Sequence, residues 1–216
     1  MNLKTIAIIG IVALAIFGLI TTYTVPLLFP KLHPPDEVHY HADFLLYLNG
    51  VPYNFSQAKY MSAENGSDLN QFIHIHDMNG KVIHLHRGGV TLGKFFNSLN
   101  MTFNPNCFVL DNGTAYCNSG SGSLKMYVQH LSEDNSTNTT RSGSWEQNYV
   151  MNNYQFNDLD RILITYGNET YTQIQEQMKS VGEDACLYSL NCPWKGKLDA
   201  NENSCTIGSA DSCGTD

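Results

Sequence analysis

Six of the eight histidines occur in His-x-His pairs, a spacing that can bring imidazole rings together. Successive side chains of a β-strand point to opposite faces, so both histidines of a pair project from the same face of a sheet. Imidazole nitrogen is a good ligand for zinc, copper, nickel and iron. The sequence therefore predicts a metal site on one sheet face. Its expected ligands are His39, His41, His74, His76, His84 and His86.

Two of these pairs lie in one stretch, residues 72–86, whose pattern is typical of a β-hairpin. A loop of residues 78–80, with Gly80 in the left-handed conformation, places His74 opposite His84. A two-residue Asn-Gly loop is the alternative, but it sets histidine against isoleucine and mixes the two faces. We expect the longer loop, because it gives one apolar face and one face with four imidazoles.

The third pair lies in a second predicted hairpin, residues 38–55, in which an Asn-Gly dipeptide marks a two-residue turn. Its first strand alternates apolar side chains with two histidines and Asp43. A carboxylate there can bind a metal, although a role in orienting a histidine fits better. His130 ends a later predicted strand, residues 124–130, and is a further possible ligand.

The cluster contains no cysteine, so its residues leave both copper and zinc open as the bound metal. The availability of copper outside the cell and the lack of a general acid and base pair favour copper. A histidine face that is only solvated is the alternative. An enzyme is not favoured, because no Glu lies in the cluster and Gly-x-Ser-x-Gly, phosphate-loop and Cys-x-x-Cys motifs are absent.

Residues 1–30 are predicted to form a transmembrane anchor, because an uncharged, largely aliphatic run there is long enough to span a bilayer. A cleaved signal peptide is the alternative, but no small-x-small cleavage site follows the run. Lys4 favours a cytoplasmic N-terminus, which puts the rest of the chain outside the cytoplasm. Residues 31–37 form a Pro-rich linker. The net charge of -8 and the lack of a basic cluster argue against a nucleic-acid partner.

Sequons and cysteines agree with export. An even cysteine number favours disulfides outside the cytoplasm. Cys107 and Cys117 flank a predicted hairpin and can bridge it. The four tail cysteines, Cys186, Cys192, Cys205 and Cys213, allow three pairings, with a four-thiolate zinc site as the alternative. Seven Asn-x-Ser/Thr sequons are candidate glycosylation sites. They begin at Asn54, Asn65, Asn100, Asn112, Asn135, Asn138 and Asn168.

The order of hairpins, helix and strands predicts an α+β domain over residues 38–167, with a β-grasp-like mixed sheet. The pattern of residues 91–100 predicts a helix, capped by Thr91, that packs on the apolar sheet face. Residues 168–216 are expected to form a helix and a disulfide-rich tail. A cupin-like β-barrel is the alternative, since cupins also carry histidines on strands.

Four segments, "HYHADFLLYLNG", "FIHIHDMNGKVIHLH", "TLGKFFNSLN" and "DRILITYG", together resemble a family of small, His-rich extracytoplasmic domains of bacteria and archaea. Its members are similar in their ordered histidine pairs and in a Thr-Leu-Gly-x-Phe-Phe motif. The resemblance covers about residues 38–167 and implies a membrane-tethered, exported domain. Some relatives are labelled disulfide isomerase, an activity that the missing Cys-x-x-Cys does not support here.

The leading interpretation is a membrane-anchored, extracytoplasmic domain that binds copper or zinc through its histidine face. A glycosylated surface structural or adhesion protein that binds no metal is the alternative. A metal-dependent enzyme is the third possibility, and it requires a metal with an open coordination position.

Overall fold

The computed structural model describes residues 37–62, 69–131, 143–192 and 196–197. All of them belong to one compact unit, Glu37–Asp216, which is distinct from Met1–Asp36. The predicted transmembrane anchor and most of the linker lie outside the described residues. Within those residues, the helices are too short or too polar to cross a membrane.

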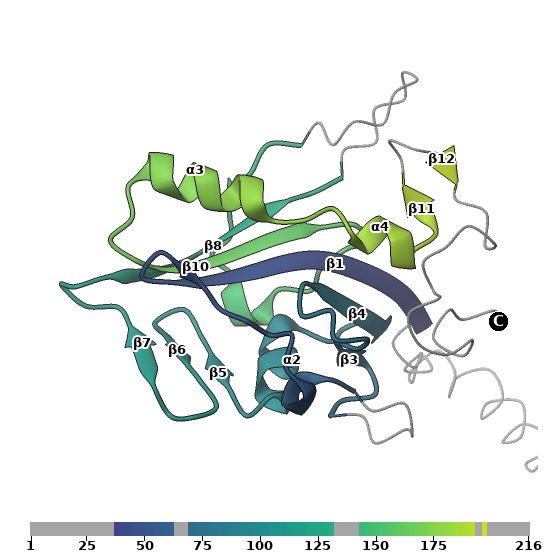
Figure 1. The fold of residues 1–216 in the computed structure, drawn as a ribbon, viewed down its shortest axis with the longest axis horizontal. Coiled ribbons are helices and arrows are strands. Elements are labelled where there is room, and N and C mark those ends of the chain that lie inside the picture. The colour runs from purple at the N-terminus through teal and green to yellow at the C-terminus, as the bar shows by residue number, and fades with distance from the viewer. Residues whose placement is uncertain (1–36, 63–68, 132–142, 193–195, 198–216) are drawn as a thin grey trace, which may run out of the picture. The chain divides into compact units, whose positions relative to one another are not determined.

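The unit combines many short strands with few helices (Figure 1). The strands are β1 (Glu37–Leu48), β2 (Val51–Pro52), β3 (Ile73–His74), β4 (Val82–Arg87), β5 (Thr102–Phe103), β6 (Cys107–Val109), β7 (Ala115–Cys117), β8 (Ser123–Gln129), β9 (Glu146–Gln147), β10 (Arg161–Gly167), β11 (Asn191–Cys192) and β12 (Gly196–Lys197). The helices are η1 (Ala58–Tyr60), α2 (Leu92–Ser98), η2 (Met151–Asn153), α3 (Tyr171–Ser180) and α4 (Ala185–Tyr188).

The main sheet is mixed, with the strand order β3-β4-β1-β10-β8-β9 and with β2 paired to the end of β1. Its central pair, β1 and β10, is parallel, and the flanking pairs are antiparallel. The predicted α+β class with a mixed sheet is therefore confirmed. The described strands form no closed barrel, so the cupin-like alternative is wrong for this part of the chain.

One face of the sheet packs against α2, as the spacing of apolar residues predicts. Phe95 and Phe96 are fully buried, and the ring of Phe95 meets Phe44 of β1 edge to face at 5.6 Å. Such aromatic pairs contribute beyond the apolar area that they bury. Thr91 occupies the N-cap position as expected, but its side chain makes no capping hydrogen bond.

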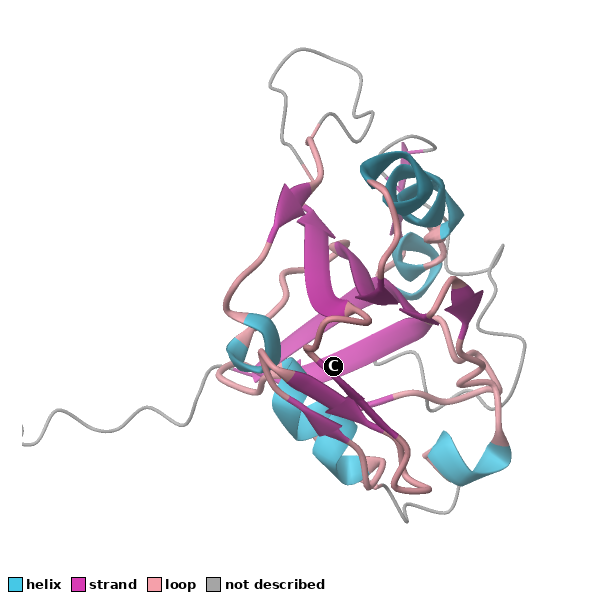
Figure 2. Cartoon of the chain, turned by 90° about the vertical axis from the view of Figure 1, so that its left-hand side faces the viewer, coloured by secondary structure: helices cyan, strands magenta, loops and turns pink. Residues whose placement is uncertain are grey.

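The opposite face is covered by α3, which lies on the other side of the sheet from α2 (Figures 1 and 2). Ile174 and Met178 of this helix pack on Leu163 of β10. Its first turn is closed by a reciprocal capping box between Thr170 and Gln173, which satisfies two backbone N–H groups.

The first hairpin turn forms as predicted, since Asn49 and Gly50 both have positive φ, at 52° and 79°. The second turn keeps the predicted pairing of His74 with His84, but its predicted backbone is wrong. Asp77 and Met78, each with φ of 56°, adopt the left-handed conformation, and Gly80 does not.

Gly80 is required for space. A Cβ atom at this position would lie 2.3 Å from the backbone carbonyl carbon of Phe55, far inside van der Waals contact. The glycine therefore lets the turn between β3 and β4 lie directly against the chain that follows β2.

A separate three-stranded sheet, β5-β6-β7, contains the third predicted hairpin. Cys107 pairs with Cys117 across its strands, and the two form the predicted disulfide.

Candidate metal centre

Three neighbouring strands place histidines in one row across the sheet. His84 of β4 is paired with His74 of β3 on one side and with His41 of β1 on the other. Ile83 and Leu85 alternate with the β4 histidines and enter the core on the other face. The predicted alternation is therefore confirmed, and the β1–β4 register joins the two hairpins into one histidine face.

Three of the six predicted ligands converge closely. His39, His41 and His84 each offer one nitrogen, and these nitrogens lie within 4.8 Å of one another, a group that could hold a metal ion. Nitrogens bound to one tetrahedral metal at about 2 Å are about 3.3 Å apart, so small side-chain movements suffice. His41 and His84 are each 1% exposed, while His39 is exposed, so the group reaches the surface at His39.

A chain of hydrogen bonds sets the tautomer of His84. The Asp77 carboxylate accepts from Nδ1 of His76 at 2.7 Å, and in that tautomer Nε2 of His76 is an acceptor. That nitrogen lies 3.2 Å from Nδ1 of His84, which is the donor in this arrangement. Nε2 of His84 is left with its lone pair. It is buried, and among the described residues it has no hydrogen-bond partner.

A second chain sets the tautomer of His41. The Ser189 hydroxyl donates its proton to Oδ1 of Asp158 at 2.6 Å, so toward His41 it can only accept. It lies 2.6 Å from Nδ1 of His41, which is therefore the protonated nitrogen. Nε2 of His41 keeps its lone pair. Metal-bound histidines commonly donate their other ring N–H in this way.

Burial keeps these two imidazoles neutral. Loss of hydration lowers the pKa of His41 to about 2, with a further contribution from neighbouring histidines. The pKa of His84 also lies well below its ordinary value, mainly because of burial. A neutral imidazole is the form that binds metal, so at neutral pH an ion would displace no proton from either ring.

The other three predicted ligands lie against this group. His86 stacks on His39 with 4.9 Å between ring centroids, and His74 lies 5.0 Å from His86. His76 lies 3.9 Å from His84 by the same measure. All six predicted ligands thus form one contiguous cluster, in which His76, two residues beyond the end of β3, orients His84 through its hydrogen bond.

The segment at α4 covers the buried side of the cluster. The ring of Tyr188 meets His84 edge to face at 4.8 Å and lies 5.8 Å from His41. Its hydroxyl accepts from the side-chain amide of Asn79 at 3.0 Å, which ties the cover to the β3–β4 turn. The Cys186–Cys192 disulfide closes this segment on itself.

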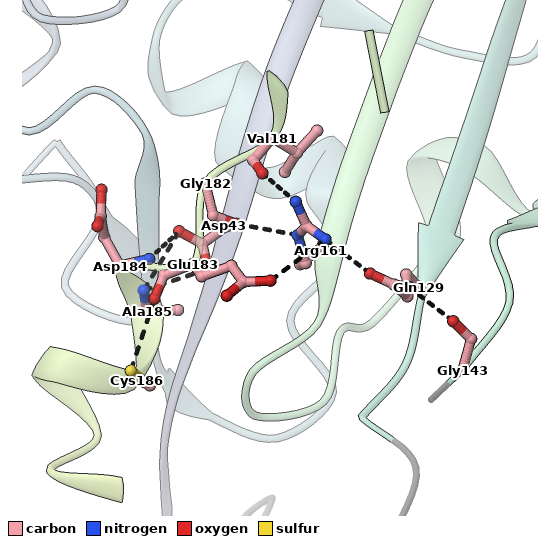
Figure 3. Close-up of polar contacts among 10 residues, drawn as sticks. All are labelled: Asp43, Gln129, Gly143, Arg161, Val181, Gly182, Glu183, Asp184, Ala185 and Cys186. Atoms are coloured by element: carbon pink, nitrogen blue, oxygen red, sulfur yellow. Dashed lines mark hydrogen bonds and ion pairs between the residues drawn. The ribbon is translucent and has the colours of Figure 1, made fainter. Parts of the chain in front are cut away.

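Two buried charged residues hold the covering segment on the sheet (Figure 3). The Asp43 carboxylate accepts from the backbone N–H groups of Asp184 and Ala185 at the start of α4. Arg161 donates to the backbone carbonyls of Val181 and Gly182. The predicted role of Asp43 was to bind metal or orient a histidine, and the structure shows that its hydrogen bonds anchor α4.

His130 lies apart from the cluster and is not in a strand, because β8 ends at Gln129. Its Nδ1 is 2.8 Å from Oδ1 of Asp160, and the hydroxyl of Tyr154 donates to the other carboxylate oxygen at 2.5 Å. Burial is the largest of the effects that raise the pKa of Tyr154. These contacts join His130 to the loop before β10, and the close group of three histidines does not include it.

The structure resolves part of the tail pairing. Cys186 bonds to Cys192, and no described cysteine is free. Cys205 and Cys213 lie outside the described residues, as do the sequon residues Asn65, Asn135 and Asn138. The sequon residues that are described are all exposed. They are Asn54, Asn100, Asn112 and Asn168.

Three residues of the site were not found from the sequence: Asp158, Tyr188 and Ser189. They come from the loop before β10 and from the end of α4, far along the chain from the histidine pairs. Their types and spacing carry no metal-site signal. Only the packing of the tail on the histidine face reveals them.

Comparison with known proteins gives no match: no family model, no curated protein and no solved structure matches this chain.

Proposed function

We propose that this protein binds a copper or zinc ion through His39, His41 and His84. The observation that carries the proposal is the lone pair on Nε2 of His84, which is buried and lacks a hydrogen-bond partner among the described residues. Leaving such an acceptor unsatisfied costs about 1–3 kcal/mol, and a bound metal would satisfy it. The two neighbouring ring nitrogens supply the other ligands.

The hydrogen-bond relays support a ligand role over a merely solvated histidine face. A solvated face leaves imidazoles free to exchange partners with water. Here His41 and His84 are buried and neutral, and their hydrogen bonds hold them in the tautomers in which Nε2 keeps its lone pair. Copper and zinc both accept such ligands. The lack of thiolates around the group is consistent with either metal.

We further propose that the domain is β-grasp-like and works outside the cytoplasm, tethered by residues 1–30. The fold proposal rests on the central parallel pair β1 and β10, each flanked by an antiparallel neighbour, with α2 across one face. The location rests on the uncharged N-terminal run and on two disulfides, which persist in oxidising compartments. We also propose, from the four motif segments, that the chain belongs to the family of His-rich extracytoplasmic domains.

Metal content tests the proposed function. The full-length protein, purified in detergent, would be loaded with copper or zinc in turn, desalted and measured by elemental analysis. We expect about one tightly held ion per chain. His84→Leu should lose it, and His39→Ala should weaken it without disturbing the fold, because His39 is exposed. His130→Ala is the matched control and should bind normally. Wild-type protein that retains neither metal would refute the proposal.

Exposure of four sequon asparagines favours a second candidate, a glycosylated surface protein. Asparagine must be accessible to be modified, and each of these residues meets that requirement. Intact-mass measurement of protein from its native membrane, before and after enzymatic deglycosylation, tests this. An unchanged mass would exclude the modification. Glycosylation itself is compatible with metal binding, since the sequons and the histidine cluster involve different residues, and the metal measurement above decides between the two candidates.

A further inference from the structure

We propose that the metal held by His39, His41 and His84 keeps an open coordination position that takes a small anion. This inference rests on the proposed function and goes beyond it, because it makes the centre a ligand-binding site rather than a closed structural one. Closed structural sites commonly have four protein ligands, whereas three-histidine sites leave the fourth position to water or substrate.

The number of converging ligands is the first support. Among the described residues, the close group contains three histidines and no fourth donor within the same 4.8 Å spacing. His76 is the ring nearest to His84, but both of its nitrogens already take part in the relay from Asp77 to His84. It therefore orients a ligand and is not available as the fourth.

Charge is the second support. The three ligands are neutral imidazoles, so they cancel none of the ion's positive charge. The carboxylates around the cluster bind other groups instead of offering an oxygen to the ion: Asp43 binds the N-terminus of α4, Asp77 binds His76, and Asp158 binds Ser189. Asp158 is close to the group, with Oδ1 3.9 Å from Nδ1 of His41, but it faces the nitrogen that points away from the ion. A dipositive ion between two buried side chains is costly unless negative charge compensates it, and a directly bound charge does so most effectively. An anion in the fourth position supplies that charge.

Burial gives the direction of approach. Tyr188 and Ser189 cover His41 and His84, while His39 is exposed. A small ligand would therefore enter on the His39 side. Its chemical class is a small anion with a donor lone pair, such as azide, cyanide or bicarbonate. Binding is an exchange in which the anion's lone pair replaces that of a water molecule, with no electron transfer.

Cobalt substitution provides the test, because tetrahedral Co(II) reports its ligands in the visible spectrum. The full-length protein loaded with Co(II) would be titrated with azide, and with perchlorate as a poorly coordinating control at equal ionic strength. We expect a saturable shift of the visible bands with azide alone. The His130→Ala variant should respond like the wild type.

The outcomes separate the two proposals. A chain that binds neither Co(II), copper nor zinc refutes both. A chain that binds Co(II) with bands unaffected by azide keeps the metal site and refutes the open position. The open position is also refuted if azide acts only after His74→Ala or His86→Ala, because that response would identify a fourth protein ligand.

Discussion

The metal-free protein should lose stability steeply as the pH falls below about 6.5, the ordinary pKa of histidine. His41 and His84 are buried as neutral imidazoles, and burial lowers the pKa of each. Unfolding returns both rings to water. Below pH 6.5 the unfolded chain therefore binds two protons that the folded chain does not, so stability rises with pH and falls on acidification.

The size of the effect follows from proton linkage. Each proton bound only by the unfolded chain contributes about 1.4 kcal/mol per pH unit. Two such protons give about 2.7 kcal/mol per unit well below pH 6.5, and a loss of about 4 kcal/mol between pH 7 and pH 5. That is a large part of the ~5–15 kcal/mol that stabilises a typical domain.

Asp158 acts in the opposite sense. Burial raises the pKa of its carboxyl group. The folded chain then holds a proton at pH values where the unfolded chain has released it. The contribution of this group to the free energy of unfolding therefore decreases as the pH rises. Its contribution therefore partly offsets the histidine slope as the pH falls.

Urea unfolding followed by circular dichroism gives the free energy of unfolding at each pH, with metal removed by a chelator. The compact unit Glu37–Asp216 is the suitable fragment. His41→Asn should reduce the slope toward one proton. A free energy that is constant or increases from pH 7 to pH 5 would falsify the buried neutral pair.

Three further predictions concern the cover and the turn. Replacing both cysteines of the α4 disulfide by serine should weaken metal binding, measured by titration, and speed deuterium exchange at the imidazole C2 positions, measured by mass spectrometry. Removing the β6–β7 disulfide is the control and should change neither. Ser189→Ala removes the hydroxyl that fixes the tautomer of its histidine partner, and we expect about tenfold weaker metal binding. Gly80→Ala should destabilise the fold by more than about 1 kcal/mol because the added Cβ meets backbone, while Gly120→Ala, which meets nothing within 4 Å, should be nearly neutral in thermal unfolding.

Strand periodicity explains why much of the site could be predicted. With a repeat of two, one choice of register places the histidines on one face and the isoleucine and leucine residues between them on the other. The observed pairing of His74 with His84 agrees with that choice. The predicted role of Gly80 in the turn is wrong because a close approach of two chain segments leaves no local signature. Gly80 looks like a left-handed residue in the sequence, and only the packing against Phe55 shows otherwise.

The covering segment could not be predicted because its role depends on long-range packing. A tail rich in Gly, Asn and Ser has too few apolar residues to form a core of its own, and disulfides can substitute for that core. In the structure Val82 of β4 packs with Ala185, Cys186 and Cys192, so the tail takes its apolar contacts from the sheet. Tyr188 and Ser189 then reach the histidines as a consequence.

Asp43 links the fold to the chemistry of the site. It lies two residues after His41 on the same strand, so strand alternation alone places both side chains on the histidine face. One strand thus supplies a proposed ligand and also the carboxylate that holds the start of α4, and Ser189, directly after α4, contacts the ring of His41. The protonated nitrogen of His41 is therefore determined by tertiary contacts of the tail. The candidate metal site and the tail thus form one structural unit, since the tail covers His84, whose Nε2 is buried without a hydrogen-bond partner among the described residues.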